Sequence, residues 1–173
     1  MLANYTQRKV WLALEANSEV VQFCERPAFV QGERGQMFDF WVKFTSGVEE
    51  FWLIQSEGED IKTSERQPQL YGRALRYVDD AALQTWDMAL ANWDRIISQL
   101  TAWRRYRDPL LSKRILLMLG VPLALGDVIA RLSHHDPEQV EAELFALLAG
   151  GQVQSPQLSQ MLLDDQTMFE RAR

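Results

Sequence analysis

The stretch 36–57, QMFDFWVKFTSGVEEFWLIQSE, decides the fold. Two runs dense in aromatic and β-branched residues flank a Thr-Ser-Gly turn at 45–47, a pattern that predicts two antiparallel strands joined as a hairpin. A lone acid, Asp39, stands between two phenylalanines of the first run. The second run is apolar until its end, where polarity returns abruptly at Gln55 and Glu57. These polar residues at strand ends raise the question of whether Asp39 is catalytic, the relic of a catalytic group, or a strand residue that faces water.

The residues around the hairpin predict a mixed α/β domain over 1–103. Apolar spacing of three and four residues predicts helices, and short β-branched or aromatic runs predict strands. The expected elements are a helix from Tyr5, strands at 20–24 (continuing at 29–30 after Pro27) and 74–78, a helix from Ala81, and a helix at 89–103. Helices and strands that alternate in this way favour a mixed sheet with flanking helices.

After residue 103 the chain changes character. Apolar periodicity predicts helices at 110–119, 125–132 and 137–148, the last opened by Asp136 and a proline, which are favoured at a helix start. Gln152-Val153 and Met168-Phe169 are expected to pair as two short strands. Three short helices followed by a two-stranded wing predict a winged helix-turn-helix domain over 104–173.

Composition excludes several classes of protein. The 173 residues are 47% hydrophobic and 24% charged, as in an ordinary globular protein rather than a disordered one. We expect no membrane span and no secretory signal, because no run of eighteen apolar residues occurs and the N-terminus lacks an apolar core. A single cysteine, Cys24, excludes an intrachain disulfide and favours the cytoplasm. A net charge of −6 argues against binding nucleic acid through overall charge. It does not exclude binding through a local cluster of lysine and arginine, because the interaction with phosphates depends on where these residues lie.

The polar residues at the strand ends match the requirements of one kind of chemistry. Metal-dependent nucleases of the PD-(D/E)XK type need an acid at the start of one strand and an acid or amide on the next, because Mg²⁺ prefers oxygen ligands. A lysine two residues further on positions the attacking water and stabilises developing charge. Asp39 and Gln55 stand where these ligands are required, and Glu57 occupies the lysine position. Each of the three is also compatible with a strand residue that merely leaves the core.

Several stretches, in their order along the chain, carry a family resemblance. They are VVQFCERP at 20–27, FDF at 38–40, FWLIQS at 51–56, RYVDDAAL at 76–83, LANWDRII at 90–97, LGDVIARL at 125–132 and DPEQVEAELFALLAGGQV at 136–153. In these stretches the chain resembles the TnsA-type endonucleases, the subunit of heteromeric transposases that cuts at transposon ends beside a DDE transposase. The resemblance covers nearly the whole chain. It implies a restriction-endonuclease-like domain and a winged-helix tail, with DNA and a DDE-type transposase subunit or an ATPase regulator as partners.

Carried over to this chain, the family's catalytic site is half present. The family's helix acid falls at or near Gln7, its strand aspartate on Asp39, and its Gln-x-Lys or Glu-x-Lys on Gln55 and Glu57. The resemblance implies Mg²⁺ held by Asp39 and Gln55 if the site is active. The amide of Gln7 removes a negative ligand from the metal, and Glu57 in place of the lysine reverses the charge beside the scissile phosphate. Because one positioned charge stabilises a transition state by several kcal/mol, either change is expected to lower the catalytic rate by orders of magnitude.

No other lysine replaces the missing one convincingly. Lys43 lies four residues along the strand from Asp39, about 13 Å away. Lys62 is expected in the loop after the hairpin, and Lys9 lies on a different side of the helix from Gln7.

A cluster of basic residues follows the first domain. It consists of Arg104, Arg105, Arg107, Lys113 and Arg114. It is either a solvated hinge between the two domains or the patch that faces DNA. The third helix of the tail carries four acids and one obvious base reader, Gln139, so phosphate repulsion makes it a poor recognition helix and favours a protein-docking role.

We therefore expect a TnsA-like subunit that binds DNA and a transposase or regulator partner, with nuclease activity reduced or lost. Two alternatives stay open. One is an active Mg²⁺-dependent endonuclease that cuts at transposon ends, and the other is a protein-interaction module unrelated to transposition.

Overall fold

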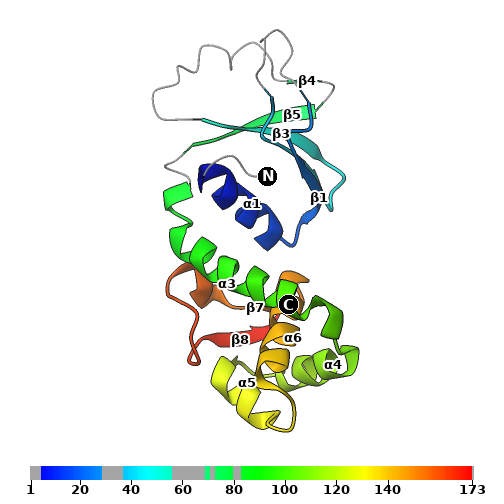
Figure 1. Ribbon diagram of the computed structural model, residues 1–173, viewed down its shortest axis with the longest axis vertical. Helices are drawn as coiled ribbons and strands as arrows, with labels where there is room; N and C mark the ends of the chain where they lie inside the picture. The colour runs from blue at the N-terminus through cyan, green and yellow to red at the C-terminus, as the bar shows by residue number, and fades with distance from the viewer. Residues whose placement is uncertain (1–4, 29–36, 56–68, 71–72, 80–82, 173) are drawn as a thin grey trace. The chain divides into compact units, whose positions relative to one another are not determined.

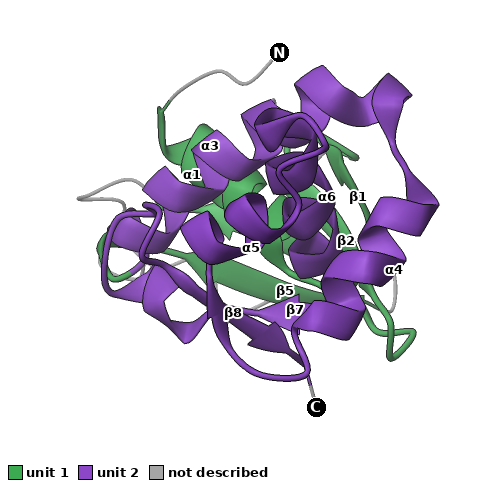
Figure 2. Cartoon of the chain, turned by 90° about the horizontal axis from the view of Figure 1, so that it is seen from below, with its two compact units in different colours: residues 1–85 green, residues 86–173 purple. Residues whose placement is uncertain are grey.

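The structure, a computed structural model, divides into two compact units, residues 1–85 and 86–173 (Figure 2). The residues that it describes are 5–28, 37–55, 69–70, 73–79 and 83–172. Each unit has its own sheet and its own buried apolar residues.

The first unit is built on a five-stranded mixed sheet. Its elements are α1 (Tyr5–Ala16), β1 (Val20–Glu25), β2 (Phe40–Phe44), β3 (Glu49–Ile54), β4 (Gln69–Leu70) and β5 (Arg73–Val78). The strand order is β1-β2-β3-β5-β4, in which β3 and β5 run parallel and every other neighbouring pair is antiparallel. Figure 1 shows α1 lying against one face of this sheet. The mixed α/β class expected for this region is confirmed.

The hairpin that links β2 and β3 is confirmed at the expected turn. Gly47 adopts φ +82°, a left-handed conformation that glycine reaches without steric cost. Register pairs Phe40 with Trp52 and Lys43 with Glu49. Because side chains alternate across a strand, this register sends Phe40 and Trp52 to one face of the sheet and Trp41 to the other.

A bend at Asp39 interrupts this alternation just before β2 begins. Phe38 and Phe40 are two residues apart and would share a face in a regular strand, yet they pack in different places. Phe38 stacks on Phe51 with ring centroids 4.5 Å apart, whereas Phe40 meets Phe23 of β1 at 6.3 Å. Both phenylalanines are almost fully buried. They fix the bend from both sides of the sheet and so fix the position of the aspartate between them.

The second unit combines helices with a three-stranded sheet. Its elements are α3 (Asp87–Trp103), the 3-10 turn η2 (Arg104–Tyr106), α4 (Pro109–Met118), β6 (Leu123–Ala124), α5 (Leu125–Arg131), α6 (Pro137–Ala149), β7 (Val153–Gln154), the 3-10 turn η3 (Pro156–Ser159) and β8 (Met168–Arg171). The sheet order is β6-β8-β7, with both pairs antiparallel.

The centre of this unit is α6. Seven of its thirteen residues are buried, and they point in all directions around the helix. It packs against α3, α4 and α5, and Phe145 meets Phe169 of β8 at a ring distance of 6.4 Å. A helix that buries residues on all sides, six of the seven here apolar, is a core helix. Only the first turn of α6 is exposed.

The structure differs from the sequence-based expectations in two places. The strand partner of Met168-Phe169 is β6, which the sequence did not predict; β7 pairs further along β8, with Val153 opposite Arg171. The helix α3 belongs to the second compact unit, whereas the sequence placed 89–103 in the first domain. The strand expected at 29–30 and the helix start expected at Ala81 lie outside the described residues.

Within the described part of the chain, no helix combines the length and the apolar content that a membrane crossing requires.

Candidate functional site

Asp39 is held at the point where β1, β2 and β3 meet. Its backbone N–H donates to the carbonyl of Trp52 at 3.0 Å, and its carbonyl accepts from the N–H of Arg26 at 2.9 Å. The two bonds run to strands on opposite sides. The side chain that leaves this point is half-buried.

Both carboxylate oxygens of Asp39 are engaged by the protein itself. Oδ1 accepts from the side-chain amide of Gln7 on α1 at 2.7 Å, and Oδ2 accepts from the backbone N–H of Ile54 at 2.8 Å. Bonds to a carboxylate are stronger than bonds between neutral groups. The carboxylate therefore joins the helix to the ends of the two central strands.

The other two predicted site residues have different outcomes. Gln55, next to Ile54, is half-buried, and its backbone N–H donates to Val78 of β5 at 2.9 Å. Glu57 lies outside the described residues. The structure thus brings together Gln7 of α1, Asp39 just before β2, and the end of β3, which Gln55 follows.

Among the described residues, Gln7, which stands at the family's helix-acid position, supplies no oxygen ligand to a shared ion. Mg²⁺ requires near-octahedral coordination by oxygen. Gln7 presents an N–H to the carboxylate rather than an oxygen to a shared ion, because an amide oxygen at 2.7 Å from Oδ1 would repel it. Among the residues described, no group of three His, Cys, Asp or Glu side chains is arranged to hold a metal ion.

The lysines considered as replacements have their own positions. Lys43 lies 3.8 Å from Glu49, an acid near the hairpin that also accepts from Arg73 and Trp41. The hydrogen bond from Arg73 is the main cause that lowers the pKa of Glu49, with Trp41 and Lys43 adding to it. Lys9 sits over the ring of Tyr5 at 5.0 Å. Lys62 lies outside the described residues.

The basic cluster of the second unit divides into two parts. Arg104 and Arg105, in η2, and Lys113 and Arg114, on α4, have exposed side chains. Arg114 also approaches Nε2 of His134 at 3.4 Å. Arg107 differs, because its guanidinium binds Glu143 through two bonds of 2.9 and 3.0 Å.

Glu143 is the residue whose role the sequence did not reveal. Its side chain is 1% exposed, and besides Arg107 it accepts from the backbone N–H of Asp108 at 2.7 Å and from the hydroxyl of Ser112. Burial by itself would raise its pKa, but the bonds from Arg107, Ser112 and Asp108 outweigh burial and lower the pKa below the ordinary value of a glutamate. The feature of the sequence that points to this role is the position of the acid in a helix whose residues Val140 and Leu147, on either side of it, are both buried.

Asn92 of α3 is a second such residue. It is 2% exposed; its amide N–H₂ donates to the carbonyls of Leu158 and Met161, and its oxygen accepts from the N–H of Leu163, all at 2.8 Å. Both donors and the acceptor are thereby used to fix the segment 158–163 against the helix.

No protein-family model matches the chain, and no curated protein is similar to it at a significant level.

The contact between Gln7 and Asp39 gives a direct prediction. Gln7→Glu replaces a donor by a second carboxylate, so we expect it to lower the free energy of unfolding by about 2 kcal/mol at pH 7, and Gln7→Ala by about 1 kcal/mol. Urea unfolding of the full chain, followed through amide signals of α1 and β2, measures both. Equal stability of Gln7→Glu and the parent chain would show that the hydrogen bond does not form.

Proposed function

We propose that this chain is a TnsA-like subunit that acts in DNA transposition in the cytoplasm, where it binds DNA and a transposase or regulator partner without cutting DNA. The single observation that carries this proposal is the state of Asp39. Both oxygens of its carboxylate accept hydrogen bonds from the protein, one of them from the amide at the family's helix-acid position. A carboxylate used in this way stabilises the fold.

The arrangement of the first unit supports a nuclease-like ancestry. The aspartate precedes β2 and the amide follows β3, and these two strands are neighbours in the sheet, as the family's chemistry requires. We propose that this is a restriction-endonuclease-like sheet whose metal site has been replaced by a hydrogen-bonded contact between Gln7 and Asp39.

The order of elements in the second unit supports a winged helix-turn-helix. A helix, a short strand, two helices and a strand pair follow one another from α4 to β8, and β6 joins the strand pair as a third strand. Its third helix, α6, is packed against three other helices. Its outer polar residues also bond within the unit: Gln139 donates to the carbonyl of Tyr106, and Glu141 pairs with Arg95 of α3. A helix so enclosed has little surface to offer to a DNA groove.

We therefore assign DNA contact to the exposed basic residues Arg104, Arg105, Lys113 and Arg114, and protein contact to the rest of the unit. Arginine and lysine on the surface bind phosphates without reading sequence. The expected DNA binding is accordingly salt-dependent and weakly specific.

The test is titration of the full chain against a random-sequence duplex at several salt concentrations. Replacing Arg104 and Arg105 together by alanine should weaken binding roughly tenfold at low salt and reduce the slope of log K against log salt by about 2. Arg171→Ala, an exposed arginine of β8, serves as the control and should change neither value. A parent chain that does not bind the duplex, or a double variant that binds as the parent does, would contradict the assignment.

A further inference from the structure

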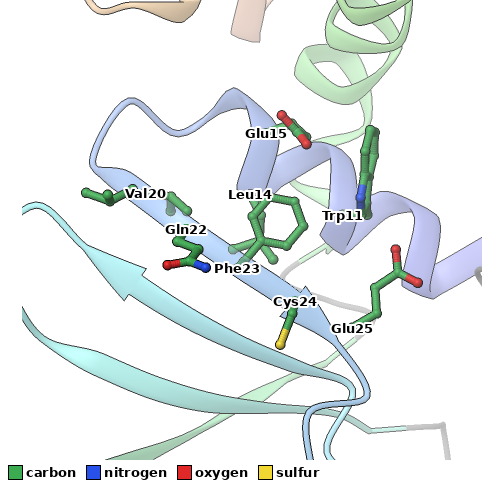
Figure 3. Close-up of a pocket in the computed structure, with 9 residues that line it drawn as sticks. Trp11, Leu14, Glu15, Val20, Gln22, Phe23, Cys24 and Glu25 are labelled. Atoms are coloured by element: carbon green, nitrogen blue, oxygen red, sulfur yellow. The ribbon is translucent and has the colours of Figure 1, made fainter.

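A groove of about 470 Å³ lies between α1 and β1 in the first unit (Figure 3). Its lining consists of Trp11, Leu14 and Glu15 from the helix and all six residues of the strand, Val20–Glu25. Its size is within the range of clefts that bind ligands. Because the whole strand lines it, the groove follows the strand rather than forming a round pocket.

The strand along this groove is at the edge of the sheet. Among the described residues, β1 pairs with β2 on one side and with no strand on the other. An edge strand offers a row of N–H and C=O groups to any extended chain beside it. Six residues of strand span about 20 Å. Val21, at a bulge where the register with β2 skips from Val20 to Gln22, has a side chain 62% exposed.

The side chains that line the groove are mostly apolar on the helix side, and the charged residues of the whole lining are acidic. The rings of Trp11 and Phe23 meet edge to face at 6.4 Å, with Leu14 beside them. Figure 3 shows Phe23 between the strand and the helix, and Cys24 pointing away from the helix. The two charged residues among the nine that line the groove are Glu15 and Glu25. An occupant that matches this lining supplies backbone hydrogen bonds, an apolar side chain and positive charge toward Glu15.

We propose that this groove binds an extended segment of a partner protein, which adds to the sheet as a strand beside β1. One apolar side chain of the segment packs against Trp11 and Phe23, and lysine or arginine on either side of it lies near Glu15 and Glu25. Strand addition of this kind takes its affinity from main-chain bonds and its specificity from the side chains on one face. A second copy of this chain fits less well, because β1 of each copy would bring its own acids to the other.

The test is a titration of the ¹⁵N-labelled full chain with three capped pentapeptides. Lys-Thr-Val-Thr-Lys has the proposed chemistry. Glu-Thr-Val-Thr-Glu reverses its charge, and Lys-Thr-Pro-Thr-Lys keeps the charge but lacks the central N–H and the apolar contact. We expect saturable shifts of the β1 amides and of the Trp11 indole N–H with the first peptide, and at least tenfold weaker shifts with the other two.

Two variants locate the binding. Glu15→Lys should weaken the first peptide about tenfold, whereas Glu138→Lys, which makes the same charge change at an exposed position outside the groove, should leave binding unchanged. Similar shifts with both lysine peptides would mean a general attraction to an acidic protein and would overturn the proposal. Absence of shifts at β1, or β1 shifts that depend on protein concentration without peptide, would overturn it as well, the latter in favour of a second copy.

Discussion

Replacing Glu143 by alanine is expected to lower the free energy of unfolding of the second unit by about 3 kcal/mol. The side chain is 1% exposed and accepts from Arg107, from the hydroxyl of Ser112 and from the backbone N–H of Asp108. Removing it leaves the part-buried N–H of Asp108 and hydroxyl of Ser112 without their acceptor, which carries a desolvation cost, and takes both bonds from Arg107, whose side chain is 43% exposed. Urea unfolding of the full chain, followed through amide signals of α6, measures the loss.

The control for this prediction is on the same helix. Glu141 pairs with Arg95; the Arg95 side chain is 49% exposed and that of Glu141 is 14% exposed. Because water reaches the arginine of this pair, the pair contributes little, and Glu141→Ala should cost less than about 1 kcal/mol. Equal losses for the two variants would show that Glu143 does not act as the acceptor at the centre of the unit.

The same contacts make the stability of the second unit depend on pH. The pKa of Glu143 is lowered in the folded state, where burial opposes the shift and the bonds from Arg107, Ser112 and Asp108 produce it. A lowered folded pKa means that the stabilisation is present above the unfolded pKa of a glutamate, about 4.3, and is lost as the pH falls through the folded value. Glu143→Gln should therefore lose stability less steeply than the parent chain below about pH 5. If the free energies of unfolding of the parent chain and Glu143→Gln fell equally steeply with pH, Glu143 would not be the source of the pH dependence.

Replacing Asn92 by leucine is expected to have an effect of similar size, about 3 kcal/mol. Leucine has nearly the same shape but no polar atoms, so the carbonyls of Leu158 and Met161 and the N–H of Leu163 lose their partner in a buried place. The segment 158–163 should detach from α3, which hydrogen exchange at Leu163 would detect. Ser98→Ala, on the exposed side of the same helix, should change stability by less than about 0.5 kcal/mol. Full protection of Leu163 in Asn92→Leu would contradict the role of the amide.

Local patterns predicted much of the secondary structure. The hairpin around Gly47 and the helices α4, α5 and α6 follow from alternation, helical spacing and caps. For example, the side chain of Asp136 accepts from the N–H of Glu138 at the start of α6. The strand β6 is not predicted because its two residues, Leu123 and Ala124, carry no periodic signal. The pairing of β7 with β8 is predicted, but its register lies two residues further along β8.

The features that local patterns do not predict depend on contacts between residues that are distant in the sequence. The sequence placed Gln7 and Asp39 in one site through a family resemblance, and the structure places them 2.7 Å apart across 32 residues. In the sequence, Glu143 is one of the four acids of the third tail helix, and nothing marks it as buried with a partner because Arg107 lies 36 residues away. Hydrophobic spacing indicates that a position is buried, but the polar partner that makes a buried acid tolerable comes from the fold.

We propose that the carboxylate of Asp39 stabilises the fold and does not hold a metal. The most direct measurement is a calorimetric titration of Mg²⁺ and then Mn²⁺ into the full chain and into Asp39→Asn, with a plasmid-nicking assay on the same samples. We predict no saturable heat and no nicking for either protein. Saturable binding and nicking by the parent chain, both lost in Asp39→Asn while that variant stays folded, would contradict the claim and identify the chain as an active metal-dependent nuclease.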